Sequence, residues 1–292
     1  MTNPNLEDLP PEPHVPGAIA NAAGAHPGVT AVASALEPPN TSPARALVNL
    51  LRLIEEMRSV DQIGVTAVAK QMDMPVATAY RLLKALEYCG FAEQLPDSKR
   101  YRLTLKLFEI GCGVASNVTV RDLAAVEMER LARQTRLAVN LGVLVGADIL
   151  YIDKIQTDDT LVLNLPPGMR APAHCTAMGK AILAHVTQDP REVIGEEPWA
   201  RSTEYSISTY DELMTELAAI RKAGWAVDRQ ELSLGIWCVS APIIDARGHV
   251  HGAISVSTLR ASFDQSELAD LGLQTLVTAR RIAARIGSFG AS

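Results

Sequence analysis

The sequence lacks several features that define whole classes of proteins. Its apolar runs are too short and too interrupted to span a bilayer, which excludes a transmembrane helix. Its first residues carry acids and prolines where a signal peptide has Lys or Arg before an apolar stretch, so we expect a cytoplasmic protein. The four cysteines form no C-x-x-C pair, which predicts reduced thiols and no zinc site of the zinc-finger type. They are Cys89, Cys112, Cys175 and Cys238.

Positive charge is also scarce. The chain has 27 Lys and Arg against 33 Asp and Glu, a formal net charge of −6. This balance excludes an indiscriminate polyanion binder, so contact with nucleic acid requires a local basic patch. Residues 1–42 have four acids and no Lys or Arg, whereas residues 43–116 have ten basic and eight acidic residues, a net charge of +2. Any DNA-binding surface is therefore expected within residues 43–116.

Motifs of common enzyme classes are missing as well. The string AHCTAMGKA has no glycine five residues before Gly179, and Ala181 stands where a phosphate-binding loop needs Ser or Thr. No G-x-S-x-G motif occurs, and the neighbours His174 and Cys175 would point apart rather than converge with Asp228 in a hydrolase site. A small-molecule enzyme and a zinc site using His174, Cys175 or Cys238 stay open as alternatives without a motif. We expect no enzymatic activity, no cofactor and no metal.

Residues 43–103 show the spacing of three helices followed by a hairpin. Apolar residues recur at helical intervals in three stretches. These are Leu47, Leu50, Leu51, Ile54 and Met57; Val65, Val68, Ala69 and Met72; and Ala79, Leu82, Leu83 and Leu86. The second and third stretches, joined by a tight turn at residues 73–75, predict a helix-turn-helix, whose second helix can enter the major groove. Strand-like runs flank residues 96–99, which predicts a wing.

The second helix of this unit would present its remaining faces to double-stranded DNA. With the leucine stripe facing the core, we expect DNA contacts from the helix and from the basic tip of the wing. The candidate residues are Ala77, Thr78, Tyr80, Arg81, Lys84, Lys99 and Arg100. Charges on a helix more often form a solvated face, and three-helix units also serve as protein-interaction modules. The wing favours DNA over both alternatives.

The rest of the chain predicts a flexible tail, a linker helix and a larger domain. Residues 1–42 have no sustained period and are expected to be flexible. A linker helix over residues 104–118 leads to a domain over residues 119–288. Its runs LAVNLGVLV, ILYIDKI, WCVSAPIID and HVHGAISVST predict strands, and AMGKAILAHV, DELMTELAAIRKAG and a stretch from Asp264 to Ile286 predict helices. This is an α+β fold, an antiparallel sheet with packed helices.

These pieces, in this order, resemble the IclR (isocitrate lyase regulator) family of bacterial transcription regulators from Pro43 to Gly287. The resemblance is carried by GVTAVAKQMDMPVATAYRLLKALEYCGFAEQ, KRYRLTLKLFEIG, AHCTAMGKAILA, GWAVDRQELSLGIWCVSAPIID and GHVHGAISVS. It implies a winged helix-turn-helix, a GAF-like effector-binding domain, and a ligand-responsive repressor or activator of a catabolic or metabolic operon. It also implies homodimers paired through their DNA-binding halves, and often homotetramers. Val76 and Met178 depart from the residues frequent in relatives, polar or basic at the first position and small at the second.

The resemblance also implies residues that contact the effector: Leu163, Ala171, Ala177, Met178, Asp228, Cys238, Ser255 and Ser257. Independently, a helix beginning near Thr176 would offer backbone N–H groups to a carboxylate. Two positions apart in a strand, Ser255 and Ser257 face the same side, and Cys238 can join them from a neighbouring strand. Small Ser and Cys residues in strands more often only pack. We expect a small organic acid as effector, aromatic or branched, with a hydroxyl group or water against Asp228.

Overall fold

The computed structural model describes residues 42–115, 119–156, 165–259 and 264–289. The tail expected over residues 1–42 lies outside this part, apart from Ser42, which begins the first helix. Leu163, expected in the effector site, also lies outside the described residues. Within them, no helix has the length and the apolar character needed to cross a membrane.

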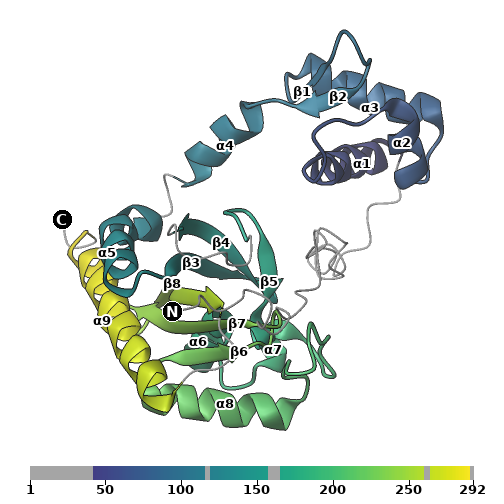
Figure 1. Cartoon of the computed structure of the whole chain (residues 1–292). Helices are drawn as coiled ribbons and strands as arrows, with labels where there is room; N and C mark the ends of the chain where they lie inside the picture. The colour runs from purple at the N-terminus through teal and green to yellow at the C-terminus, as the bar shows by residue number, and fades with distance from the viewer. Residues whose placement is uncertain (1–41, 116–118, 157–164, 260–263, 290–292) are drawn as a thin grey trace, which may run out of the picture.

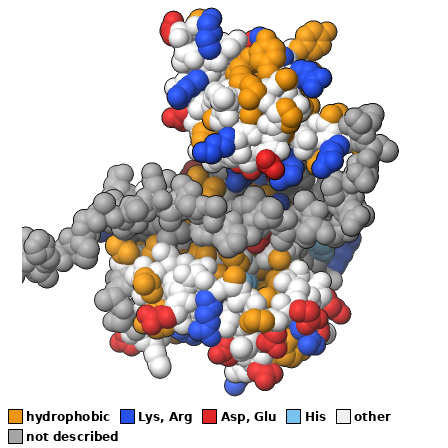
Figure 2. All heavy atoms as spheres, turned by 90° about the vertical axis from the view of Figure 1, so that its right-hand side faces the viewer, with side chains coloured by type: hydrophobic (Ala, Val, Ile, Leu, Met, Phe, Trp, Pro, Cys, Tyr) orange, Lys and Arg blue, Asp and Glu red, His pale blue; other side chains and the backbone are white. Residues whose placement is uncertain are grey.

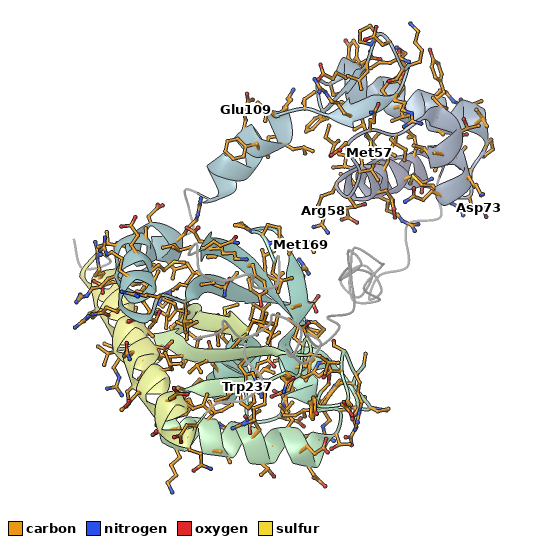
Figure 3. All side chains as sticks on the ribbon, viewed as in Figure 1. Met57, Arg58, Asp73, Glu109, Met169 and Trp237 are labelled. Atoms are coloured by element: carbon orange, nitrogen blue, oxygen red, sulfur yellow. The ribbon has the colours of Figure 1, made fainter. Side chains whose placement is uncertain are left out.

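The smaller, N-terminal half is a winged helix-turn-helix (Figure 1). Its elements are α1 (Ser42–Met57), α2 (Val65–Gln71), α3 (Val76–Tyr88), β1 (Ala92–Gln94) and β2 (Tyr101–Leu103). The two strands pair antiparallel, with Glu93 opposite Arg102. Asp73, in the turn between α2 and α3, has a φ of 48° (Figure 3), a left-handed conformation in which Asp is enriched. This turn sets the angle between the two helices.

The core of this half confirms one predicted stripe and corrects another. Ala79, Leu82, Leu83 and Leu86 of α3 are all buried, as their spacing predicts. On α1, however, the predicted core residues Leu47 and Leu51 are 64% and 63% exposed, and Leu53 is completely buried instead. The stripe of α1 that packs inward is Leu50, Leu53, Ile54 and Met57. Because α1 has apolar residues on two adjacent faces, the helical period alone does not identify the inner one.

The larger half is built on a six-stranded antiparallel sheet with the strand order β5-β4-β3-β8-β7-β6. Helix α4 (Lys106–Ala115) leads away from the wing toward it (Figure 1). The strands are β3 (Ala138–Val145), β4 (Asp148–Ile155), β5 (Arg170–Pro172), β6 (Ala226–Arg229), β7 (Ile236–Ile244) and β8 (Val250–Leu259). The helices are α5 (Thr119–Thr135), η1 (Ala173–Cys175), α6 (Ala177–Val186), α7 (Arg191–Ile194), α8 (Tyr210–Ala223) and α9 (Gln265–Phe289). The predicted α+β fold is confirmed.

Helices cover both faces of this sheet. Helices α5 and α9 lie side by side on one face (Figure 1), and α6 and α8 pack together on the other. Strand alternation turns Val139 and Leu141 of β3 into the core that α5 and α9 cover. Asn140, between them, points to the opposite face. Polar side chains of β3, β7 and β8 therefore meet on the α6 side of the sheet.

Candidate functional site

The exposed face of α3 carries most of the residues predicted to contact DNA. Ala77, Tyr80 and Arg81 are exposed, and Thr78 is half-buried. The Nε atom of Arg81 donates to the carbonyl of Ala77 at 3.3 Å, which holds the guanidinium along this face. The buried stripe of α3 fixes the helix against α1 and α2. The outward face of α3, which carries Arg81 and the exposed ring of Tyr80, is thus rigidly placed.

Lys84, also predicted to contact DNA, differs from Arg81 because its charge is already paired. Its Nζ lies 2.6 Å from Glu87 Oε2 and 6.0 Å from the centroids of the Tyr80 and Tyr101 rings. The hydrogen bond to Glu87 raises the pKa of Lys84. Lys84 is therefore an intrahelical partner of Glu87, and a DNA contact would have to compete with that pair.

The wing places two further cations at its tip. Lys99 and Arg100 are both exposed in the turn between β1 and β2. The turn is closed by hydrogen bonds from Leu95 N to Arg100 O at 2.8 Å and from Lys99 N to Leu95 O at 3.0 Å. Figure 2 shows Lys and Arg side chains around the margin of the upper lobe with hydrophobic side chains between them, whereas acidic side chains are more frequent on the lower lobe.

The larger half contains a small cavity, lined by both polar and apolar side chains, on the α6 side of its sheet. Its volume is about 20 Å³, which is enough for about one water molecule. A small organic ligand would require the cavity to widen. The cavity is lined by Asn140, Tyr151, Leu165, Asp228, Leu232, Ser233, Ile236, Cys238 and Ser257.

Three of the predicted effector residues, Asp228, Cys238 and Ser257, line this cavity. Neighbouring strands pair Asp228 with Cys238 and Cys238 with Ser257, and the Cys238 Sγ lies 3.2 Å from the Ser257 Oγ. Asn140 Nδ2 donates to Ser257 Oγ at 3.0 Å and to Ser255 Oγ at 3.4 Å. Ser255 and Ser257 therefore face the same side, as predicted, with Ser255 one step behind the cavity wall.

Ala171, Ala177 and Met178 do not line the cavity; they are buried in the apolar core beside it. The first turn of α6 is covered by η1, and its N-cap Thr176 accepts a hydrogen bond from Gly179 N at 3.1 Å. One of the N–H groups that was predicted to meet a carboxylate is therefore already bonded within the protein. The small residues of AHCTAMGKA serve close packing here.

Asp228 is the lining residue that titrates near neutral pH. Burial and then the nearby Glu231 raise its pKa, Lys180 lowers it, and the result is a pKa of about 7. Its Oδ1 accepts from the backbone N–H of Glu231 at 2.6 Å. Near neutral pH a large fraction of this carboxyl is protonated, so that it can donate a hydrogen bond as well as accept one. Among the described lining residues there is no Lys or Arg.

Six of the nine lining residues were not predicted from the sequence: Asn140, Tyr151, Leu165, Leu232, Ser233 and Ile236. Asn140 interrupts an otherwise apolar strand, LAVNLGVLV, and a polar residue in a strand buried on both faces is a signal that could have identified it. Tyr151 carries no comparable signal, because an aromatic residue in a strand usually packs in a core. Within the described ranges no group of three or more His, Cys, Asp or Glu side chains is placed to hold a metal ion.

Comparison with known protein families covers both halves of the chain. Residues 42–96 match the model of the IclR helix-turn-helix domain. Residues 112–284 match the model described as bacterial transcriptional regulator IclR C-terminal. The first segment covers the three helices and the first strand of the wing, and the second covers most of the half that contains the cavity.

Individual relatives show the same arrangement. The chain is 31% identical over 252 residues to the HTH-type transcriptional regulator KdgR of Escherichia coli strain K12, covering 86% of this chain and 95% of that protein. The crystal structure of the Thermotoga maritima IclR is 28% identical with a TM-score of 0.70, covering 83% of this chain and 99% of that one. An IclR homolog of Microbacterium hydrocarbonoxydans, complexed with 4-hydroxybenzoate, shares the fold with 20% identity and a TM-score of 0.73, covering 83% and 99%.

Proposed function

Because the chain belongs to the IclR family of bacterial transcriptional regulators, we propose that it binds operator DNA and that a small organic acid effector changes this binding. The operator would control a catabolic or metabolic operon. The observation that carries the proposal is the exposed face of α3 beside a basic wing, in one chain with a cavity that joins polar and apolar side chains. These roles require no catalytic step, and we propose the cytoplasm as the place where the protein meets its DNA.

For DNA binding, α3 would enter the major groove while the wing contacts flanking phosphates. Arg81 and Thr78 would read base edges or fix the register, supported by Ala77 and Tyr80. Lys99 and Arg100 would neutralise phosphates, and Lys84 would contribute only where DNA displaces Glu87. In a dimer, two copies of α3 would lie in successive major grooves about 34 Å apart on a pseudo-palindromic site.

Replacing Arg81 by alanine should weaken binding to the specific DNA site by about 1–3 kcal/mol, a roughly 5- to 150-fold increase in Kd. The reason is that a bidentate Arg contact to a base edge is lost, whereas the exposed position of Arg81 on α3 leaves the fold intact. Fluorescence anisotropy with the upstream DNA of the gene measures this change.

Arg133→Ala is the matched control, since it removes the same charge from the exposed surface of α5, away from the helix-turn-helix. It should leave Kd within about twofold, because a single remote surface charge adds little at physiological salt. An Arg81→Ala protein that binds the specific DNA as tightly as this control does would remove Arg81 from the reading surface.

The effector is proposed to occupy a widened form of the cavity. Asp228 would face a hydroxyl of the ligand, because its carboxyl repels a carboxylate when ionised. A ligand carboxylate would accept from the hydroxyl groups of Tyr151 and Ser257, and Cys238 would lie against it. The apolar lining, Leu165, Leu232 and Ile236, favours an aromatic or branched acid. Ser255, Ala171, Ala177 and Met178 would form the layer behind the ligand.

Self-association is proposed to use exposed apolar side chains of the DNA-binding half. Leu47 and Leu51 of α1 are joined by Leu105, Phe108 and Ile110 at α4, which are 77%, 69% and 50% exposed. A second copy of the same chain would cover these residues in a homodimer, and contacts between larger halves would complete a homotetramer. Exposed patches of this kind mark interfaces more often than free surface.

A further inference from the structure

The side chain of Lys180 is completely buried behind the effector cavity. It extends from α6, and its relative exposure is 0%. Its Nζ lies 2.5 Å from Glu231 Oε1 and 3.2 Å from Glu216 Oε1 of α8. Arg229 Nη1 reaches the same Glu216 oxygen at 3.0 Å. A completely buried lysine is costly to desolvate and is rare unless it is paired, so this position calls for an explanation beyond packing.

Glu231 connects this ammonium to the wall of the cavity. Its backbone N–H donates to Asp228 Oδ1 at 2.6 Å, and its Oε1 accepts from Arg229 N at 3.3 Å. Its carbonyl accepts from Ser206 Oγ at 2.6 Å. The residues that follow, Leu232 and Ser233, line the cavity. Lys180 therefore holds the segment that carries both Asp228 and part of the cavity wall.

The charges in this cluster do not balance when all its groups are ionised. Three carboxyl groups, those of Asp228, Glu231 and Glu216, face two cations, Lys180 and Arg229. No described residue donates to Glu231 Oε2, although this oxygen is completely buried. One proton on any of the three carboxyls neutralises the cluster, and Asp228 is the one of them that lines the cavity.

The other titratable groups that face Asp228 or Lys180 belong to β4, β7 and η1. Burial raises the pKa of Tyr151, Cys175 and Cys238 and lowers that of His174, so each favours its uncharged form. In contrast, Glu231 lies beside both Asp228 and Lys180, and it pairs with Lys180 at a shorter distance than Glu216 does. The charge state of the cavity is thus governed by the two carboxyls and by Lys180.

We propose that Lys180 is a positioning residue of the effector cavity: its buried ammonium fixes the Glu231 segment and sets whether Asp228 meets the effector as an acid or as a carboxylate. The proposal rests on the proposed effector function of the cavity. It assigns a role in recognition to a residue that touches no ligand. The charge on Asp228 would decide which ligand the cavity selects. An ionised carboxylate selects a hydroxyl that donates to it, and a protonated carboxyl can also select a hydroxyl that accepts from it.

The test compares the pH dependence of stability with and without Asp228 in three backgrounds of the full chain: wild type, Lys180→Met and Glu231→Gln. In each background, the denaturant midpoint is measured for the protein with and without Asp228→Asn between about pH 4 and pH 9, a range that spans the carboxyl titrations. The three tryptophans, Trp199, Trp225 and Trp237, all belong to the larger half, so their fluorescence reports its unfolding. No ligand or DNA is needed.

The profile of Asp228 is the difference in stability between the proteins with and without Asp228→Asn, plotted against pH, and its upper bend is the pH above which this difference stops changing. We expect the two substitutions to move this bend in opposite directions. In Lys180→Met an attractive cation is lost, and the upper bend of the profile should move to higher pH by about one pH unit. In Glu231→Gln a repulsive carboxylate is lost, and the bend should move to lower pH by about one pH unit. Gln keeps the shape and the acceptor oxygen of Glu231. The Glu231→Gln protein should therefore fold and can be measured even when Lys180→Met folds poorly.

A purely structural role for Lys180 gives a different result. Lys180→Met would then lower stability at every pH while the bend stays where it is in wild type, and that outcome would overturn the proposal whatever Glu231→Gln does. Lys222→Met, on the exposed side of α8, is the matched control and should leave the bend unchanged. If the proposed regulatory function is wrong but the role of Lys180 is right, the protein would show no specific DNA binding, while the bend would still shift in Lys180→Met.

Discussion

Replacing Gly179 by alanine should lower the free energy of unfolding of the larger half by about 3 kcal/mol or more. A Cβ at this position would lie 2.1 Å from Ala173 O and 2.4 Å from Ala173 Cα, and both are backbone atoms that cannot rotate away. The added methyl group must push η1 off the first turn of α6, which breaks the packing beside the cavity. Denaturant unfolding followed by tryptophan fluorescence measures the loss.

Gly111→Ala provides the control for this prediction. Gly111 also lies in a helix, α4, but nothing lies within 4 Å of the position its Cβ would take. Alanine there should leave stability unchanged or raise it by up to about 1 kcal/mol, the usual helix preference of Ala over Gly. If Gly179→Ala cost less than about 1 kcal/mol, far below the usual cost of overpacking, the close approach of η1 to α6 would be wrong.

Replacing Asp228 by asparagine should stabilise the larger half at about pH 8 by up to about 4 kcal/mol. The pKa of Asp228 is raised from 3.8 to about 7, first by burial and then by Glu231. A raised carboxyl pKa gives stability that is fully present below the unfolded value and is lost as pH rises through the folded value. Wild type should therefore lose stability between about pH 4 and pH 7, at about 1.4 kcal/mol for each pH unit.

The Asp228→Asn protein should lack this decline, because asparagine does not titrate and its side-chain oxygen can still accept from Glu231 N. Measuring the denaturant midpoint of both proteins from about pH 4 to pH 8 tests the sign directly. Parallel curves for the two proteins would show that Asp228 ionises in the folded chain as easily as in the unfolded one. At the acid end of this range the two midpoints should nearly coincide.

The elements that were predicted well are the longer ones with a strong apolar pattern. The buried stripe of α3 follows from its helical period, and the long strands β3, β4, β7 and β8 follow from apolar runs bounded by turn residues. The short strands β5 and β6 were missed, since three or four residues carry too little period to recognise. On α1, two apolar faces compete, and only the packing decides that Leu53 rather than Leu51 is buried.

The candidate site was predicted in part for a similar reason. Strand pairing could be anticipated for Ser255, Ser257 and Cys238, and the structure brings them together through Asn140. The helix start at Thr176 was recognised, but the sequence does not reveal that η1 covers it. The buried charges of Lys180 and Glu231 lie 51 residues apart, and no local pattern relates them.

Binding of the purified chain to intergenic DNA, with the region upstream of its own gene tested first, is the most direct test of the central claim. Fluorescence anisotropy at near-physiological salt, with excess nonspecific competitor, separates specific from nonspecific binding. We predict tight binding that resists the competitor and disappears when residues 43–103 are deleted. Binding that the competitor removes from every intergenic fragment, equally with and without residues 43–103, would contradict a role as a DNA-binding regulator.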